Sequence, residues 1–284
     1  MQQHYFLFAL ALIWTLFATV QDIKTREVAN WLNFSLIAIG LSYSAFFAAF
    51  TKNIDFFLLG LFGFIIFFAL AHIFYYSRAF AGGDAKLLMG FGAILPYSSY
   101  FSLVSLTLCF LFSLFLIGAV YSLIYSFFII IKNKEKFIKE LTKLVNKWKK
   151  LLIITPALFI ILVLLFLTGS LFNLFVFWSL FFILVVFPWL WLYTKSLDLC
   201  MISLTPPEKL TEGDWLEKNV KVGNKTIKKT VHGLSLQDIK LLKKHKISVK
   251  IKQGIPFVPA FLLTLIILIF FLPKLSALLS LFGL

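Results

Sequence analysis

Long apolar runs separated by short polar segments dominate the chain. Each of these runs is long enough to cross about 30 Å of hydrocarbon as a helix; they lie at 4–21, 31–50, 55–76, 101–131, 151–168, 171–193 and 255–272. A shorter run, 85–97, is marginal for a span unless its helix begins earlier or the bilayer thins. No positive residue precedes the first run, so it is predicted to be a span and not a cleaved signal peptide. The pattern predicts an all-α polytopic membrane protein, a bundle of about 7–8 transmembrane helices.

The stretch 194–254 has a different pattern, polar and marked by turn signals. A Gly-Asn pair between two alternating segments predicts a hairpin, a Ser followed three residues later by Asp predicts a helix start, and a second alternating segment predicts a strand. These signals are Gly223-Asn224 between 220–222 and 225–227, Ser235 with Asp238 before a helix to about Lys246, and 247–251. We expect a small cytoplasmic α+β insert.

A basic segment, 132–150, connects two of the apolar runs. Phe137, Leu141, Leu144 and Trp148 recur there at helical spacing, and lysines occupy most other positions. This spacing is typical of an amphipathic helix on the inner membrane surface. The ordinary cytoplasmic ends of two long spans would have the same pattern, and both interpretations stay open.

Composition agrees with a membrane protein. The chain is 61% hydrophobic and has 36 phenylalanines and a mean hydropathy of +0.96, outside the range of soluble domains. Basic residues near span ends are retained on the cytoplasmic side, and with eight spans and an outside N-terminus only Lys52 and Lys274 of the 27 basic residues fall outside. This bias accounts for the net charge of +15 without a nucleic-acid partner. We therefore expect a multi-pass protein of the plasma membrane.

These patterns divide the chain into five predicted parts. The parts are a transmembrane region 1–131, a basic amphipathic cytoplasmic helix 132–150, a transmembrane hairpin 151–193, a small cytoplasmic domain 194–254 and a C-terminal transmembrane segment 255–284.

Two aspartates lie where a membrane chain should avoid charge. Asp22 ends the first apolar run and Asp84 precedes the short fourth one. An ionisable group beside the acyl region costs roughly 2.5–3.5 kcal/mol, so it marks a functional site by default. The predicted topology returns both residues to the cytoplasmic boundary. Structural roles are the alternative: Asp84 as a helix N-cap, and Asp22 as the partner of a nearby basic residue.

A pair of carboxyl groups can hydrolyse a peptide bond without further help. The ionised group accepts a proton from water while the protonated one hydrogen-bonds the scissile carbonyl. The histidines and cysteines do not have the spacing of metal ligands or of a disulfide; they are His4, His72, His232, His245, Cys109 and Cys200. We therefore predict no metal and no cofactor.

Helix ends suggest different roles for the two carboxyl groups. Asp22 ends a helix, where the helix dipole disfavours an anion, whereas Asp84 opens one, where free N–H groups favour it. Our hypothesis is that Asp84 starts as the base and Asp22 as the acid.

Two segments resemble the motifs of type IV prepilin peptidases. Residues 22–32, DIKTREVANWL, are similar to the stretch that follows the first catalytic aspartate of that family, D-x-(K/R)-x-R-x-(I/V)-P-N-W. Residues 81–88, AGGDAKLL, are similar to its second motif, G-x-G-D followed by A-K-L. Ala81 and Ala29 replace the first glycine and the proline of these motifs, and the paired Cys-x-x-Cys motifs of many bacterial members do not occur.

The C-terminal quarter resembles the archaeal branch of this family, which includes relatives that process preflagellins. The similarity lies in GLSLQDI at 233–239 and GIPFVPAF at 254–261. The resemblance implies an aspartic endopeptidase with Asp22 and Asp84 as catalytic residues on the cytoplasmic side. Its partners would be the lipid bilayer and prepilin-like or preflagellin-like precursors, cleaved between a basic leader and a hydrophobic helix.

Gly82 and Gly83 are the predicted substrate-binding residues. Adjacent glycines before a helix permit either a turn or the close approach of an extended substrate backbone to Asp84. Two other functions remain possible for the chain: a proton-coupled transporter with Asp22 and Asp84 as a relay, and a non-catalytic membrane scaffold. Cleavage of a precursor separates the peptidase from both.

Overall fold

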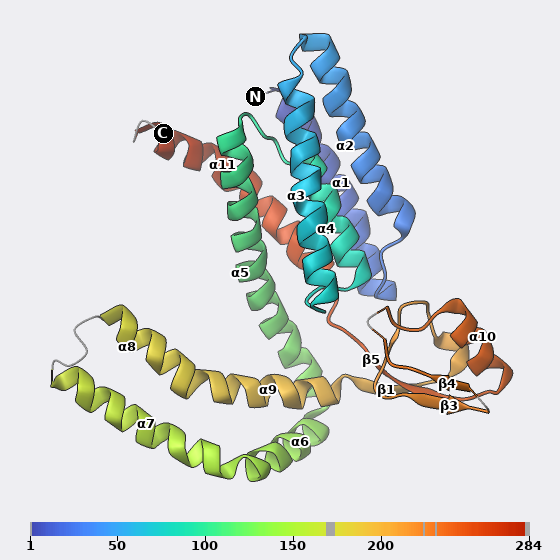
Figure 1. Ribbon diagram of the computed structural model, residues 1–284, viewed down its shortest axis with the longest axis vertical. Helices are drawn as coiled ribbons and strands as arrows, with labels where there is room; N and C mark the ends of the chain where they lie inside the picture. The colour runs from blue at the N-terminus through green and yellow to red at the C-terminus, as the bar shows by residue number, and fades with distance from the viewer. Residues whose placement is uncertain (1, 169–173, 224, 231, 282–284) are drawn as a thin grey trace. The chain divides into compact units, whose positions relative to one another are not determined.

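The structure is a computed structural model that describes residues 2–168, 174–223, 225–230 and 232–281. Most of these residues are helical (Figure 1). The chain divides into two compact units, Met1–Leu123 with Gly254–Leu284, and Ile124–Gln253.

Five of the described helices are long and apolar enough to cross a membrane. They are Phe6–Thr25, Asn30–Thr51, Asp55–Tyr76, Tyr100–Lys132 and Leu174–Cys200. Lys134–Lys147 and Leu152–Leu167 would form a sixth span only if taken together, and they are bent by 69° at their junction. The expected all-α polytopic membrane protein is confirmed. Fewer than the expected 7–8 helices of spanning length occur within the described residues, because the fourth helix and Val258–Phe270 are too short to cross the hydrocarbon layer.

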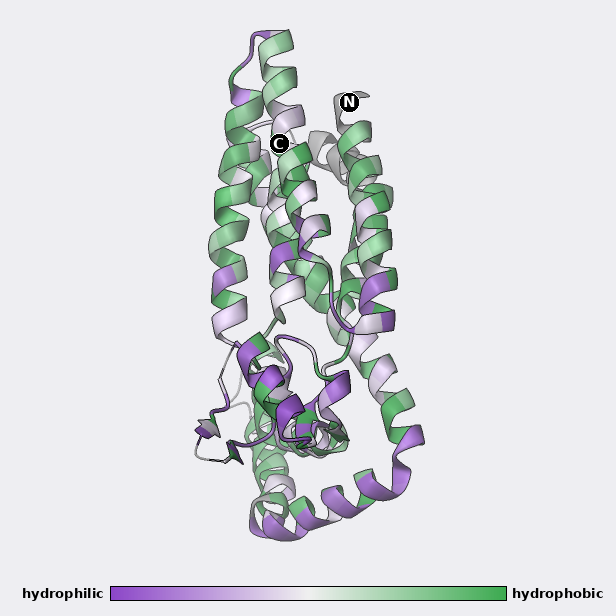
Figure 2. Ribbon diagram, turned by 90° about the vertical axis from the view of Figure 1, so that its right-hand side faces the viewer, coloured by the Kyte–Doolittle hydropathy of each residue, from purple (hydrophilic) through white to green (hydrophobic). Residues whose placement is uncertain are grey.

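The first unit consists of membrane helices that are apolar around their whole circumference, as buried and lipid-facing helices are. Figure 2 shows the hydrophobic colour continuing along them. Their bounds are α1 Gln2–Thr25, α2 Asn30–Thr51, α3 Asp55–Tyr76, α4 Gly82–Ile94, α5 Tyr100–Lys132, which continues into the second unit, and α11 Val258–Leu281.

Helix α4 lies at the centre of this unit and contacts α1, α2 and α3. It begins at the glycine pair, three residues earlier than the apolar run 85–97 indicates. Its 13 residues measure about 20 Å at 1.5 Å per residue, too short for the hydrocarbon layer. Nearly all its side chains from Asp84 to Ile94 are buried, so α4 is an enclosed helix whose environment is protein.

Glycines bring α4 close to its neighbours. A Cβ added at Gly63 of α3 would lie 2.4 Å from the Gly92 carbonyl oxygen, and one added at Gly90 would lie 2.7 Å from Leu36 of α2. Membrane helices associate through close backbone packing, because lipid gives no hydrophobic force between them. These glycines therefore fix the position of α4, and with it the position of Asp84.

The second unit begins with the end of α5 and continues through a series of helices. Their bounds are α6 Lys134–Lys147, α7 Lys149–Leu167, α8 Leu174–Phe181, a π-helical turn Phe182–Val186 and α9 Phe187–Cys200. Helix α6 corresponds to the predicted amphipathic segment, and its Phe137 is buried against Tyr193 and Leu197 of α9. Part of its apolar face therefore packs on protein.

The insert has the predicted α+β composition. Strand β5 (Val249–Lys252) lies between β1 (Ile202–Thr205) and β2 (Trp215–Leu216), both antiparallel to it. Strands β3 (Val220–Val222) and β4 (Lys225–Ile227) form the predicted hairpin, although Asn224 of its turn is outside the described residues. A 3₁₀ turn spans Pro207–Lys209, and α10 spans Leu236–Lys244. Ser235 caps α10 with Asp238, as predicted.

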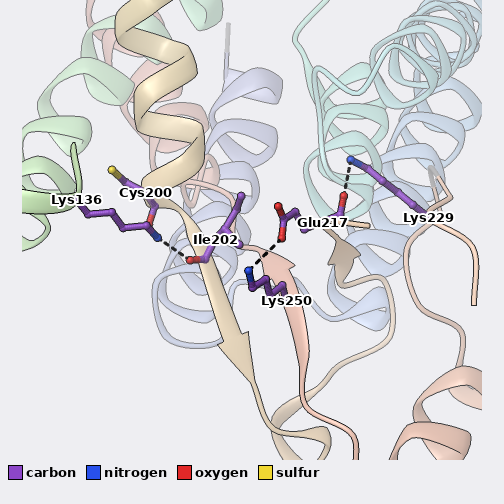
Figure 3. Close-up of polar contacts among 6 residues, drawn as sticks. All are labelled: Lys136, Cys200, Ile202, Glu217, Lys229 and Lys250. Carbon is purple, nitrogen blue, oxygen red and sulfur yellow. Dashed lines mark hydrogen bonds and ion pairs between the residues drawn. The ribbon is translucent and has the colours of Figure 1, made fainter. Parts of the chain in front are cut away.

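Lysine side chains connect the parts of this unit (Figure 3). Lys136 of α6 donates a 3.0 Å hydrogen bond to the Ile202 carbonyl at the start of β1. Glu217 pairs with Lys250 at 4.0 Å, and its carbonyl accepts a 3.3 Å hydrogen bond from Lys229. These exposed contacts add modestly to stability; the first joins α6 to the sheet, and the other two lie within the insert.

Candidate active site

Asp22 lies in the last turn of α1, and its carboxylate contacts the start of α11. The backbone N–H of Val258 donates a 3.0 Å hydrogen bond to Asp22 Oδ2. The side chain is 6% exposed. A buried carboxylate needs such donors, because burying it without hydrogen bonds is costly. The beginning of α11 is therefore part of the environment of Asp22.

Asp84 is the third residue of α4, and it is buried as well, with 8% exposure. Its Oδ2 accepts a 3.2 Å hydrogen bond from the Ala81 N–H. This is one half of a capping box, and the other half is missing because alanine has no side-chain acceptor. Asp84 is therefore not the N-cap of α4, as the structural alternative supposed; the N-cap is Ala81, and Asp84 accepts its N–H from the third helical position with one of its two oxygens.

The two aspartates belong to the same compact unit, and their carboxyl groups interact electrostatically. Helix α1 contacts both α4 and α11. Gly83, next to Asp84, lies beside Val28, which follows α1: a Cβ added at Gly83 would be 3.5 Å from Val28. The site is thus formed where the end of α1 meets the beginnings of α4 and α11 (Figure 1).

Polar contacts hold the segment after α1 in place. The backbone of Arg26 is left-handed, with φ of 61°, where the chain leaves α1. The guanidinium of Arg26 donates a hydrogen bond to the Gly254 carbonyl, before α11. Gln21 Oε1 accepts a 3.0 Å hydrogen bond from the Ala29 N–H. These contacts fix α1 relative to both α2 and α11.

A hydrogen bond between Asn30 and Lys86 joins the starts of α2 and α4. Helix α2 begins at Asn30, its N-cap is Ala29, and no side chain caps it. The Asn30 Oδ1 accepts a 2.6 Å hydrogen bond from Lys86 Nζ. Lys86 is two residues after Asp84, so this contact connects the start of α2 with the first turns of α4.

The two departures from the prepilin peptidase motifs fit the local backbone. Ala81 has φ of −72° and ψ of 165°, an extended conformation that does not require glycine. Ala29 has φ of −60°, which suits proline equally well. Its N–H is bonded to Gln21, a contact that proline would not make.

Gly82 and Gly83 are inside α4 as its first two residues, and not in a turn before it. A Cβ added at Gly82 would be 3.8 Å from Tyr75, an ordinary contact, and neither glycine has a positive φ. Packing within the protein thus does not demand glycine at these positions. Their predicted role in substrate binding stays a prediction.

Sequence reasoning missed the contribution of Val258 to this site. The resemblance of 254–261 to the archaeal proteins was the only signal for it. With this contact, Asp22 receives an N–H from the beginning of α11 just as Asp84 receives one at the beginning of α4. The helix-end argument for Asp84 as base and Asp22 as acid therefore no longer distinguishes the two.

No group of three or more His, Cys, Asp or Glu side chains within the described residues has the arrangement of a metal site. Cys109 and Cys200 are free thiols. The polar groups described at the candidate site are thus the two carboxyl groups and the backbone N–H groups that donate to them.

Fold and site together define a polytopic helical membrane protein with a buried carboxyl pair where three helix ends meet. Residues 9–123 match the model of the Type IV leader peptidase family. The matched part of the chain contains both Asp22 and Asp84 and is similar to that family.

Archaeal relatives are similar to the same part of the chain. The preflagellin peptidase of Methanococcus voltae is 35% identical over 89 residues, 31% of this chain and 38% of the relative. The preflagellin peptidase of Methanocaldococcus jannaschii is 32% identical over 89 residues, and that of Methanococcus maripaludis is 30% identical over 92, with 38% of each covered. The chain thus spans little more than a third of the length of these curated relatives. No solved structure matches the chain.

Proposed function

We propose that this protein is a membrane-embedded aspartic endopeptidase that removes the leader peptides of preflagellin-like or prepilin-like precursors. The observation that carries the proposal is the convergence of Asp22 and Asp84, buried and electrostatically coupled, at the ends of α1 and α4. The family of residues 9–123 and the names of the archaeal relatives support the substrate class.

The proposed reaction uses the two carboxyl groups and one water molecule. The ionised carboxylate accepts a proton from water, whose oxygen attacks the scissile carbonyl carbon. The protonated carboxyl hydrogen-bonds the carbonyl oxygen. As the C–N bond breaks, the leaving nitrogen takes the proton that the carboxylate accepted from water, which releases an acid and an amine and returns the carboxyl pair to its starting state. The Val258 N–H stabilises the anionic form of Asp22 without transferring a proton.

The location of the pair fits a substrate cut at the junction between leader and hydrophobic helix. A peptide bond inside a helix is shielded by its hydrogen bonds, so cleavage requires an unwound segment where water is available. Asp22 lies near the end of an apolar helix next to basic residues 24 and 26, which we place at the cytoplasmic boundary by the positive-inside rule. Gly82 and Gly83 would let the unwound backbone approach Asp84.

The test is co-expression of the full-length protein with an archaeal preflagellin precursor, followed by N-terminal sequencing of the product. We expect a single new N-terminus between the basic leader and the hydrophobic helix. Asp22→Asn and Asp84→Asn should each abolish it while the protein still accumulates in the membrane. A cut that survives either substitution, or no cut by the unsubstituted protein, would reject the proposal.

A further inference from the structure

Thr19 is a buried polar residue near Asp22, and the reaction proposed above does not use its side chain. It precedes Asp22 by three residues on α1, so both side chains project from the same face of the helix. The residue is 7% exposed. Its hydroxyl has no hydrogen-bond partner within the part of the chain that the structure describes. A buried hydroxyl without a partner costs about 1–3 kcal/mol.

Thr107 of α5, like Thr19, has a buried hydroxyl without a partner in the described part of the chain, but four other buried hydroxyl groups on the described membrane helices are satisfied by their own helix. Each donates to the carbonyl four residues earlier, as helical Ser and Thr commonly do. The pairs are Thr15 with Ala11 at 2.6 Å, Ser44 with Gly40 at 3.0 Å, Ser196 with Leu192 at 2.8 Å and Thr264 with Ala260 at 2.7 Å. Thr19 does not make this bond, although Thr15 offers a carbonyl at the same offset. Its hydroxyl is therefore available to a partner beside the helix.

Thr15 is a natural reference for Thr19. It lies one turn further from Asp22 on the same face of α1, it is fully buried, and its hydroxyl is satisfied. The two residues thus have the same side chain, lie on the same helix and are both buried. What differs is the distance along the helix to Asp22 and the free hydroxyl of Thr19.

We propose that Thr19 is a positioning residue for the water that the carboxyl pair activates. A water molecule in a buried site needs two to four polar partners. The carboxyl groups of Asp22 and Asp84 supply two, and one oxygen of Asp22 is already engaged by Val258. The Thr19 hydroxyl supplies the third partner. Its oxygen accepts a hydrogen bond from the water hydrogen that the carboxylate does not take. A lone pair on the water oxygen is then free to attack the carbon of the substrate carbonyl. No proton leaves Thr19, so its action is orientation.

This inference rests on the proposed function, and the kinetic test uses the full-length protein with a preflagellin precursor. Thr19→Val removes the hydroxyl at nearly constant shape, and it should lower kcat on the order of 100-fold with KM changed by less than about threefold, because misplacing a reacting group costs this much. Thr19→Ser should restore most of kcat. Thr15→Val should retain kcat within about twofold. Equal losses in both valine variants, or no loss in Thr19→Val, would overturn the proposal.

A second measurement separates this inference from the proposed function. Infrared spectra of the carboxyl region, with bands assigned through Asp22→Asn and Asp84→Asn, report the hydrogen bonds of the pair without any substrate. Thr19→Val should shift a carboxyl band and Thr15→Val should not. Thermal unfolding of Thr19→Val should occur at or above the temperature of the unsubstituted protein, because its hydroxyl has no partner in the protein. An unchanged carboxyl spectrum would overturn the inference even if the precursor is cleaved, whereas failure of the unsubstituted protein to cleave counts against the proposed function alone.

Discussion

The Val258 N–H and the Asp22 carboxylate form a 3.0 Å hydrogen bond across 236 residues of sequence. This contact makes the beginning of the last described helix a part of the site at the end of the first. It is reinforced by the hydrogen bond from Arg26 to the Gly254 carbonyl. The position of α11 should therefore influence the chemistry of Asp22.

The first prediction concerns the N–H of Val258. Val258→Pro removes this donor and keeps a backbone angle suited to the first helical residue. We expect kcat for precursor cleavage to fall on the order of 100-fold, the usual effect of removing one donor from an active site. Val258→Ala loses the same side-chain packing but retains the N–H, and it should stay within severalfold of the unsubstituted protein. Equal kcat values in the two variants would show that the N–H does not matter.

The second prediction asks whether Gly82 and Gly83 are needed for the close approach of the substrate backbone or for packing within the protein. A Cβ at Gly82 or Gly83 meets only ordinary contacts at 3.8 and 3.5 Å, so alanine should not lower the unfolding temperature. If the substrate backbone approaches Asp84 here, kcat/KM should fall by about tenfold or more, because small displacements of reacting atoms are costly. The measurement is a cleavage time course for Gly82→Ala and Gly83→Ala. Unchanged kinetics in both would exclude close approach at these residues.

The third prediction concerns the packing of α4. A Cβ at Gly63 would lie 2.4 Å from the backbone oxygen of Gly92 and 2.3 Å from the Tyr97 ring, so α3 and α4 would have to separate. Overpacking of this kind costs about 1–3 kcal/mol. We expect Gly63→Ala to lower the thermal unfolding temperature in detergent and to reduce cleavage. Gly82→Ala is the matched control without a clash, and equal unfolding temperatures for the two variants would contradict the packing described.

The fourth prediction concerns Asp214 in the insert. Burial raises the pKa of this carboxyl above its ordinary value of 3.8, and the Thr211 N–H that it accepts at 2.9 Å acts in the opposite direction. An acid with a raised folded-state pKa stabilises the fold fully below its ordinary pKa, and this contribution is lost as the pH rises through the folded-state value. Raising the pH through this window should lower the protection of the Leu234 amide, which donates to the Asp214 carbonyl, from hydrogen exchange.

Asp214→Asn is the control for that titration. It should remove this part of the pH dependence after correction for intrinsic exchange. The same pH profile in both proteins would mean that another group is responsible.

The sequence predicts the membrane spans well where apolar runs are long, because hydrocarbon requires helices of about 20 residues. It is less informative about α4, whose 13 residues are placed by glycine contacts with α2 and α3 and not by their length. It also does not reveal the bend between Lys134–Lys147 and Leu152–Leu167 or the packing of α6 on α9, because periodicity reports one helix at a time.

At the candidate site, sequence reasoning selected Asp22 and Asp84 because charge is rare beside hydrocarbon. It did not find Val258, because a backbone N–H has no sequence signature. It did not find the hydrogen bond from Lys86 of α4 to the Asn30 side chain at the start of α2, because the two residues are 56 positions apart in sequence. Thr19 was also missed, because its distinction is an unmade hydrogen bond that only the fold reveals.

The fifth prediction tests the central claim, that Asp22 and Asp84 act as one unit. The measurement is the rate of precursor cleavage by the purified full-length protein and its Asp22→Asn, Asp84→Asn and doubly substituted variants. Residues that act together show grossly non-additive losses, so each single substitution should abolish measurable cleavage and the double should be no worse than either. A single variant that still cleaves the precursor would contradict a shared catalytic site.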